Sequence, residues 1–342
     1  MKKRIFSVLL ITALMLATCT ACRPEDTVME SDRSEAPPES NTEQPPKEEE
    51  AVDLFGSLFP KEGNIPGKKQ IVSLAKELAS NTSRITEINY TFKSGKTSME
   101  VLAGHYDEYH ETAAPEESPL QLVYEDNEYY NYVLYLPEGY DPADTETKWP
   151  VIYFFHGIGE IGNDLSVLLH YGPLRYLNNG GRLDAIVIAP QCPVNSHWAD
   201  TDTEVEKLVK FVPEMSEKYN IDTDRMYLTG LSMGGRCTWK LALAMPDAFA
   251  AIAVICGRTN TYEFDTIQNM PVWMFHGAQD ATVSFDNVNK ILKELDANDH
   301  RYYKVTVFPQ QGHDIWNYVD DRPEVYDWLL SQSLSGNLAK AK

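Results

Sequence analysis

One stretch near residue 230 constrains the fold more than any other part of this chain. An apolar run from Met226 to Leu228 leads into Gly230-Leu231-Ser232-Met233-Gly234-Gly235, and a helix-compatible segment follows from Cys237 to Met245. A buried strand, a sharp turn and a helix in this order form a nucleophile elbow, which exposes a serine hydroxyl at the turn. Glycines are needed beside that serine because a Cβ there would collide with the flanking strand or helix. The stretch therefore predicts Ser232 as a nucleophile.

Short apolar runs and amphipathic segments alternate after Leu120. An antiparallel pair comes first, with strands predicted over Gln121 to Tyr124 and Tyr129 to Leu136. Six further runs are typical of buried strands: Val151 to Phe155, Ala185 to Ala189, Met226 to Leu228, Ala250 to Ile255, Val272 to Phe275 and Tyr303 to Phe308. Helices are predicted around Val205 to Tyr219, Val288 to Leu295 and Pro323 to Leu330. We therefore expect an α/β fold, with a mostly parallel central sheet and helices on both faces.

The predicted catalytic domain covers residues 120–332 and is followed by a tail, residues 333–342. Residues 54–119 are predicted to form a small N-terminal extension. Within it, Ile71 to Leu78 is compatible with a short helix, and alternation over Ile85 to Phe92 and Met99 to Val101 indicates strands. We expect these strands to form a small layer packed against the main domain.

The first 22 residues have the pattern of a bacterial export signal: a positively charged start, an apolar core and small residues before Cys22. A cysteine at such a junction resembles the lipobox, so Cys22 is the favoured lipidation site and Cys19 the alternative. Residues 23–53 are rich in Pro and Glu and are predicted to be a disordered acidic linker. Together these features predict a bacterial cell-surface lipoprotein whose one membrane contact is the lipid anchor, with ordinary secretion as the alternative.

Charge and cysteine content exclude several classes of partner. The formal net charge of -21 argues against nucleic-acid binding, because phosphates would be repelled and no basic stripe is present. Cys192, Cys237 and Cys256 are odd in number and are not at metal-ligand spacing. They indicate neither a disulfide framework nor a metal site, and we expect them to be small buried hydrophobic residues.

A serine nucleophile needs a base and an acid that orients the base. In folds with a nucleophile elbow, these residues follow one another along the chain in the order Ser, Asp or Glu, His. His313 follows the last predicted strand and is the predicted base, because a loop at that end of the sheet reaches the elbow. His300 precedes the same strand and is expected at the opposite edge. Asp280 follows the strand from Val272 to Phe275 and is the predicted acid.

Two backbone N–H groups are expected to stabilise the oxyanion. One belongs to Met233, directly after the nucleophile, and the other to Ile158, in the loop after the first parallel strand. Gly157 lets that loop turn inward. Trp198 and Trp316 are candidates for the substrate cleft, although Trp198 is equally compatible with a packed core position.

Five ordered motifs between Leu120 and Leu330 resemble α/β-hydrolases of the carboxylesterase and phospholipase-like, putative-peptidase type, which are close to feruloyl and acetylxylan esterases. They are Phe-Phe-His-Gly-x-Gly-Glu, Ala-Pro-Gln-Cys-Pro with a following Trp, the stretch ending in Gly-Leu-Ser-Met-Gly-Gly, Val-Trp-Met-Phe-His-Gly-x-x-Asp and Gly-His-Asp-x-Trp. The resemblance implies a cofactor-free serine hydrolase with Ser232, Asp280 and His313 as its triad.

The predicted reaction is hydrolysis of a carboxylic ester, on a small molecule or on plant polysaccharide, through an acyl-enzyme. Esters are favoured over peptides because an alkoxide is the easier leaving group. Two alternatives remain: a serine peptidase of the prolyl-oligopeptidase-like type and a non-catalytic solute-binding lipoprotein. The sequence leaves the acyl and alcohol specificity and the oligomeric state open.

Overall fold

The computed structural model describes residues 85–103, 118–124, 129–198 and 201–341. The predictions for the export signal, the acidic linker and the helix from Ile71 to Leu78 lie outside the described residues. None of the helices in the described ranges combines the length and the apolar character needed to cross a bilayer.

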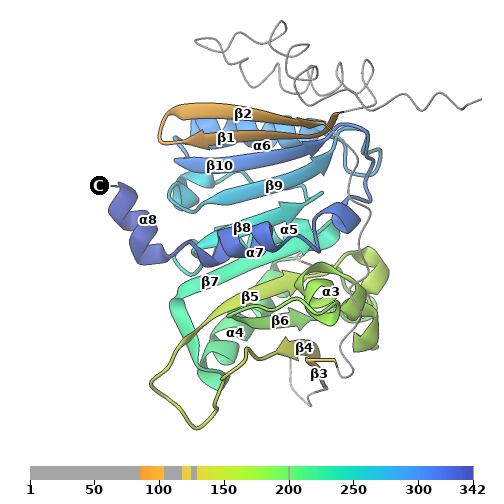
Figure 1. The fold of residues 1–342 in the computed structure, drawn as a ribbon, viewed down its shortest axis with the longest axis vertical. Helices are drawn as coiled ribbons and strands as arrows, with labels where there is room; N and C mark the ends of the chain where they lie inside the picture. Colours follow the sequence, from red (N-terminus) through yellow and green to blue (C-terminus); the bar gives the residue numbers. More distant parts are fainter. Residues whose placement is uncertain (1–84, 104–117, 125–128, 199–200, 342) are drawn as a thin grey trace, which may run out of the picture. The chain divides into compact units, whose positions relative to one another are not determined.

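A ten-stranded sheet forms the centre of this part of the chain, in the order β2-β1-β10-β9-β8-β7-β5-β6-β4-β3 (Figure 1). The strands are β1 Ile85–Lys93, β2 Lys96–Ala103, β3 Leu120–Val123, β4 Tyr132–Tyr135, β5 Trp149–Phe155, β6 Ile186–Pro190, β7 Ile221–Leu231, β8 Ala251–Ile255, β9 Val272–Gly277 and β10 Tyr302–Phe308. The strands from β10 to β6 in this order pair in parallel, and an antiparallel pair borders them on each side. The predicted mostly parallel α/β sheet is confirmed.

Helices cover both faces of the sheet. The α-helices are α3 Gly172–Asn178, α4 Asp202–Lys218, α5 Met233–Ala244, α6 Asp286–Ala297, α7 Pro323–Leu330 and α8 Leu334–Ala341. Short 3-10 helices are η1 Ile158–Glu160, η2 Leu165–His170, η3 Phe264–Ile267 and η4 Trp316–Tyr318. Side chains of α4, α5 and α6 share one core cluster with Tyr153 of β5, whereas those of α3 and α7 share the other with Phe154. Successive residues of one strand thus enter opposite cores, as the pleat requires.

The N-terminal strands differ from the expected separate layer. β1 and β2 form a hairpin that continues the central sheet, and β1 pairs antiparallel with β10 in a register that places Ile88 opposite Val307. The physical reason is that β10 would otherwise be an edge strand with unpaired backbone groups, which β1 satisfies. In the predicted tail, residues Leu334–Ala341 form helix α8.

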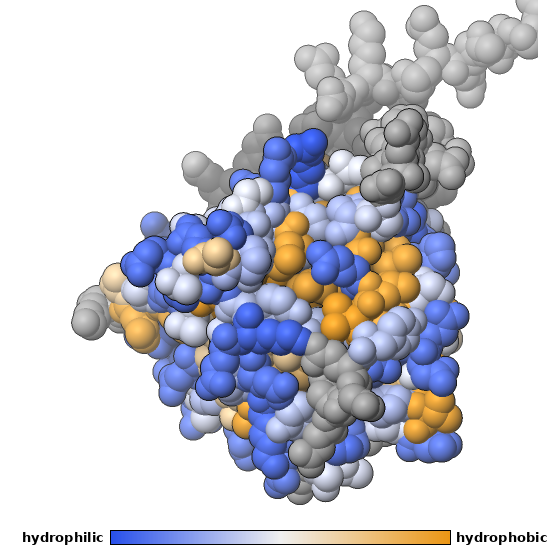
Figure 2. Space-filling model, turned by 90° about the horizontal axis from the view of Figure 1, so that it is seen from below, coloured by the Kyte–Doolittle hydropathy of each residue, from blue (hydrophilic) through white to orange (hydrophobic). Residues whose placement is uncertain are grey.

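The opposite edge of the sheet ends in β3, which has only four residues. Gln121 and Leu122 on this strand are exposed. Figure 2 shows the molecule from this side, with apolar side chains in separate patches between polar ones. A short edge strand offers little backbone for pairing with another chain.

Candidate active site

The turn after β7 holds Ser232 in a strained conformation, with φ 53° and ψ -112°. Only glycine fits at the neighbouring positions. A Cβ on Gly230 would lie 2.6 Å from backbone atoms of Gly234, and a Cβ on Gly234 would lie 1.9 Å from the carbonyl oxygen of Phe155. The Ser232 N–H donates to the carbonyl oxygen of Ile255 at 2.8 Å, which fixes the turn against β8. The elbow geometry that the sequence predicts is therefore present.

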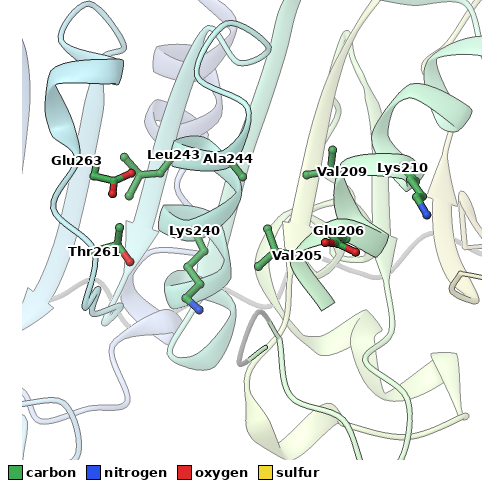
Figure 3. A pocket seen from close by; sticks show the side chains of 9 residues that line it. All are labelled: Val205, Glu206, Val209, Lys210, Lys240, Leu243, Ala244, Thr261 and Glu263. Carbon is green, nitrogen blue, oxygen red and sulfur yellow. The ribbon is translucent and has the colours of Figure 1, made fainter. Parts of the chain in front are cut away.

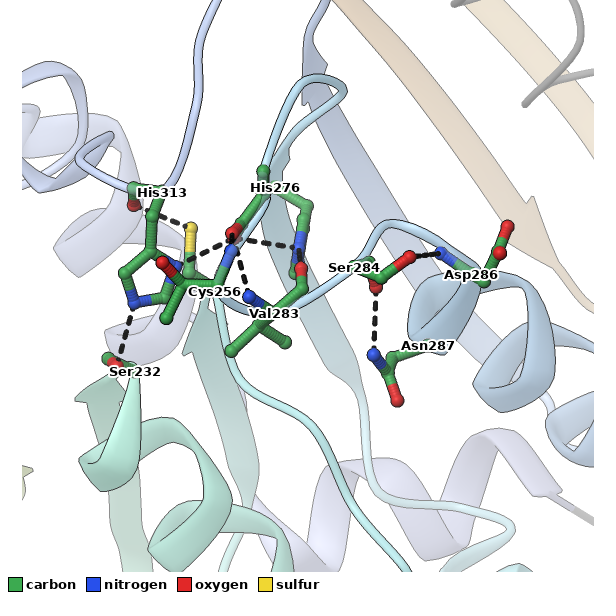
Figure 4. Close-up of polar contacts among 10 residues, drawn as sticks. Ser232, Cys256, His276, Val283, Ser284, Asp286, Asn287 and His313 are labelled. Atoms are coloured by element: carbon green, nitrogen blue, oxygen red, sulfur yellow. Dashed lines mark hydrogen bonds and ion pairs between the residues drawn. The ribbon is translucent and has the colours of Figure 1, made fainter.

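The structure brings Ser232, Asp280 and His313 together in one hydrogen-bonded row (Figure 4). The Nε2 atom of His313 lies 2.8 Å from the Ser232 Oγ, and its Nδ1 atom lies 2.7 Å from Oδ2 of Asp280. Ser232 follows β7, Asp280 follows β9 and His313 follows β10. All three come from loops at the carboxyl ends of parallel strands, which meet at one edge of the sheet.

The Asp280 carboxylate is buried and heavily hydrogen-bonded. Its Oδ1 accepts the N–H groups of Thr282 at 2.8 Å and Val283 at 2.7 Å, while Oδ2 lies 3.2 Å from Nε2 of His276. Burial by itself raises the pKa of Asp280, but the hydrogen bonds from His276, His313 and Val283 outweigh it and hold the pKa below the ordinary value. The carboxylate is thus ionised at neutral pH and holds Nδ1 of His313 in its protonated form.

His276 contributes to this site more directly than the sequence indicates. Its Nε2 lies 2.8 Å from the carbonyl oxygen of Val283. The same atom also contacts Asp280. This contact depends on how the chain folds back after β9. In the sequence, the only indication of it is the spacing of four residues between His276 and Asp280.

The loop after β5 is braced by His156, which is fully buried. Its Nε2 accepts the N–H of Cys192 at 2.9 Å, and its Nδ1 lies 2.6 Å from the carbonyl oxygen of Gly157. Nδ1 therefore carries the proton. Burial lowers the pKa of His156 to about 4, so the ring is neutral. The neutral ring thus joins the loop after β5 to the loop after β6.

The two predicted oxyanion donors occupy equivalent positions. Ile158 is the first residue of η1, and Met233 is the first residue of α5. The N–H of the first residue of a helix has no acceptor within that helix, so both groups are available to a ligand. A Cβ on Gly157 would lie 2.7 Å from Leu231 Cδ1 and 3.1 Å from Glu160 Oε2, so this loop is tightly placed.

The two cleft candidates have different environments. Trp198 is fully buried and packs against the rings of Tyr130, Phe155 and His156, so of its two predicted environments the structure shows the packed core position and not the cleft. The aromatic side chains of β4 and β5 give its indole more apolar contact than an open cleft would. The ring of Trp316 stands edge-on to that of His313, with centroids 5.6 Å apart.

Cys256 is an unexpected neighbour of the triad. It adopts a positive φ of 47°, and its Sγ donates to the carbonyl oxygen of His313 at 3.1 Å. Its Sγ also lies within 4.8 Å of candidate ligand atoms of His276 and Asp280. Burial raises the pKa of the Cys256 thiol well above its usual value. A neutral thiol is a poor metal ligand, so this cluster fits a hydrogen-bonded support for the triad better than a metal site.

A cavity of about 450 Å³ lies between α4 and α5 (Figure 3). Val205 and Val209 line it from α4, and Leu243 and Ala244 line it from α5. None of the three triad residues contributes to its lining. The cavity is therefore separate from the candidate active site.

Known proteins share parts of this sequence and of this fold. Residues 189–328 match the dienelactone hydrolase family. The crystal structure of a thermostable esterase superposes with a TM-score of 0.50 at 28% identity, covering 59% of this chain and 59% of that one. The chain has the α/β-hydrolase fold. Ser232, Asp280 and His313 all lie within the range that matches the dienelactone hydrolase family, residues 189–328.

Two esterases show how similar this α/β-hydrolase is to known proteins in sequence. The bifunctional acetylxylan esterase/xylanase XynS20E of Neocallimastix patriciarum is 27% identical over 164 residues, which are 47% of this chain and 24% of the relative. Feruloyl esterase C of Emericella nidulans is 30% identical over 131 residues, which are 37% of this chain and 46% of the relative. The chain thus matches less than half of each of these relatives. The predicted likeness to feruloyl and acetylxylan esterases is confirmed.

Proposed function

We propose that this α/β-hydrolase is a serine esterase that cleaves carboxylic esters through an acyl-enzyme. The observation that carries the proposal is the unbroken row of hydrogen bonds from Asp280 through His313 to Ser232. An ionised, buried carboxylate at one end and a strained, half-buried serine at the other are compatible with general-base activation of a hydroxyl.

In the proposed reaction, the Ser232 Oγ attacks the ester carbonyl carbon while His313 Nε2 takes the hydroxyl proton. Asp280 stabilises the resulting imidazolium through its bond to Nδ1. The N–H groups of Ile158 and Met233 stabilise the oxyanion of the tetrahedral intermediate. The intermediate then expels the alkoxide, which takes the proton from Nε2. Water, activated by the same nitrogen, hydrolyses the acyl-enzyme and releases the carboxylic acid.

We propose acetyl or feruloyl esters of plant polysaccharide as the substrate class. The similarity to an acetylxylan esterase and to feruloyl esterases supports this choice. The position of Trp316 beside His313 also supports it, since an indole next to the proposed base offers an apolar face to an aromatic acyl group or to a sugar ring. Anchoring at the bacterial cell surface through Cys22 or Cys19, which would place the enzyme beside such polymers, stays a prediction.

The test is a release assay on the purified protein. Its substrates are p-nitrophenyl acetate and butyrate, methyl ferulate, acetylated xylan and a proline-containing peptide anilide. We expect ester turnover that Ser232→Ala abolishes, whereas Ser284→Ala, an exposed serine outside the triad row, keeps it. Cleavage of the anilide alone would favour the peptidase. Turnover that survives in Ser232→Ala would sink the proposed mechanism, and no turnover by the unaltered protein would return attention to a solute-binding role.

A further inference from the structure

A second cavity, of about 280 Å³, lies among the segments where the last parallel strands begin. Pro271 immediately precedes β9, and Tyr302 is the first residue of β10. The triad residues follow the other ends of the parallel strands, so the cavity and the triad occupy opposite ends of the sheet. Helix α8, which contributes Asn337 and Lys340, lies at the end away from the triad (Figure 1).

Three cationic side chains line this cavity: Lys93, Arg301 and Lys340. All three are exposed, and within the described ranges none of them forms an ion pair with an acidic group. Three unpaired cations at one cavity are unexpected in a chain with a net charge of -21. Their positive potential favours an anionic ligand.

Backbone contacts hold two of these cations in place. The Ser94 N–H donates to the carbonyl oxygen of Arg301 at 2.8 Å, and the Arg301 N–H donates to the carbonyl oxygen of Gln268 at 2.9 Å. Lys93 lies opposite Tyr302 in the pairing of β1 with β10. The sheet therefore fixes the backbone that carries the Lys93 and Arg301 side chains.

Asn269, one of the residues that line the cavity, has an unsatisfied hydrogen-bond acceptor in its side chain. Oδ1 of Asn269 is buried and has no partner in the part of the chain that the structure describes. A buried polar atom without a partner costs about 1–3 kcal/mol, so a ligand that supplies an O–H donor gains from binding there. Sulfate and other fully ionised anions lack such a donor, whereas a polyol has several.

An aromatic pair completes the lining. The rings of Tyr302 and Trp328 are stacked with centroids 6.1 Å apart, and Trp328 Nε1 donates to the Tyr302 hydroxyl at 3.1 Å. Both side chains are half-buried and contribute to the cavity. An indole surface is suited to the C–H face of a sugar ring. The volume is just below that of pockets for drug-sized ligands, so it suits a single small ring.

We propose that this cavity binds a sugar acid of hexuronate size, with its carboxylate against the three cations and a hydroxyl donating to Asn269. The site is independent of the triad and of the proposed esterase activity. It would hold a uronate unit at the end of the sheet away from the reacting serine.

The proposal is tested by calorimetric titration of the full chain with D-glucuronate, D-glucose and inorganic phosphate at low ionic strength. We expect D-glucuronate to bind with a Kd below about 1 mM, with phosphate weaker and glucose without measurable binding. The double variant Arg301→Gln, Lys340→Gln should bind glucuronate at least ~10-fold more weakly, since each lost contact is a hydrogen bond to a charged group. Lys96→Gln removes a cation of the same hairpin that does not line the cavity, and it should change the affinity less than twofold.

Three results would overturn the proposal. Absence of glucuronate binding would do so, as would equal loss in Lys96→Gln and the double variant, which would indicate a nonspecific charge effect. Phosphate binding as tight as glucuronate would make the ligand a simple anion and not a sugar acid. Ester turnover by the double variant should equal that of the unaltered protein. A failure of the glucuronate proposal can therefore be distinguished from a failure of the proposed esterase activity.

Discussion

The tripeptide Phe-His-Gly occurs twice in this chain, as Phe155-His156-Gly157 at the end of β5 and as Phe275-His276-Gly277 at the end of β9. Both histidines are buried, with 0% and 1% of their surface exposed. The first copy begins the loop that carries the Ile158 N–H, and the second begins the loop that carries Asp280. One copy thus precedes the oxyanion donor and the other precedes the acid.

The two imidazoles bond differently. His156 accepts the N–H of Cys192, a residue in the loop after β6, and so joins two loops. His276 contacts Val283 and Asp280, within its own loop, and so joins that loop to the triad. Identical local sequences therefore support different parts of one site, because the partner of each ring comes from a different neighbouring loop. Four variants test this comparison.

The largest effect is expected at the end of the second loop. Asp280→Asn replaces the charge that fixes the tautomer of His313, and kcat should fall about 10⁴-fold with the fold retained. Asp314→Asn is the matched control, since Asp314 is exposed and its side chain accepts from Asn317. Steady-state kinetics with p-nitrophenyl acetate measure both. A comparable loss in Asp314→Asn would mean that the wrong acid has been assigned.

The next effect belongs to the first loop. Ile158→Pro removes the proposed donor N–H at the first position of η1, where proline is tolerated. We expect kcat to fall about 10²- to 10³-fold. Ile158→Ala keeps the N–H and removes only a side chain that is 61% exposed, so kcat should stay within about threefold. If both variants lose the same activity, the side chain and not the backbone donor is what matters.

The third test concerns His276 as a positioning residue. His276→Phe removes both of its hydrogen bonds to Asp280 and Val283, and kcat should fall about 10-fold or more with KM nearly unchanged. His276→Gln keeps an N–H donor and should recover part of the rate. A loss of thermal stability with kcat intact would leave His276 a purely structural role.

The smallest effect is a pH dependence of stability at His156. Burial lowers its pKa from 6.5 to about 4, so between these values the unfolded chain binds a proton that the folded chain does not. The contribution of His156 to the free energy of unfolding is fully present above pH 6.5. It decreases as the pH falls toward 4, by at most ~1.4 kcal/mol per pH unit. Urea unfolding of the unaltered protein and of His156→Gln should show the difference between them shrinking over this window. A constant difference would mean that His156 does not titrate differently on folding.

The local pattern predicts the sheet and the elbow well. Uninterrupted apolar runs occur only where both faces of a strand are covered, so the parallel strands are visible in the sequence. The glycines around Ser232 predict the turn because only glycine fits there. Trp198 shows the limit of this reasoning. An aromatic residue in a loop is compatible with a cleft and with a core, and its burial against Tyr130 and Phe155 depends on strands far apart in the sequence.

The sequence by itself determined the fold class, the chain order of Ser232, Asp280 and His313, and the strand ends on which they lie, because these follow from hydrophobic periodicity and from glycines at fixed spacing. Only the tertiary structure decided that His276 also contacts Asp280, that the β1–β2 hairpin continues the sheet, and that three cations share a cavity with Asn269. Each of these is a contact between distant segments. Such contacts depend on which backbone edges and side chains remain unpaired after the local elements have formed, and local patterns do not encode that.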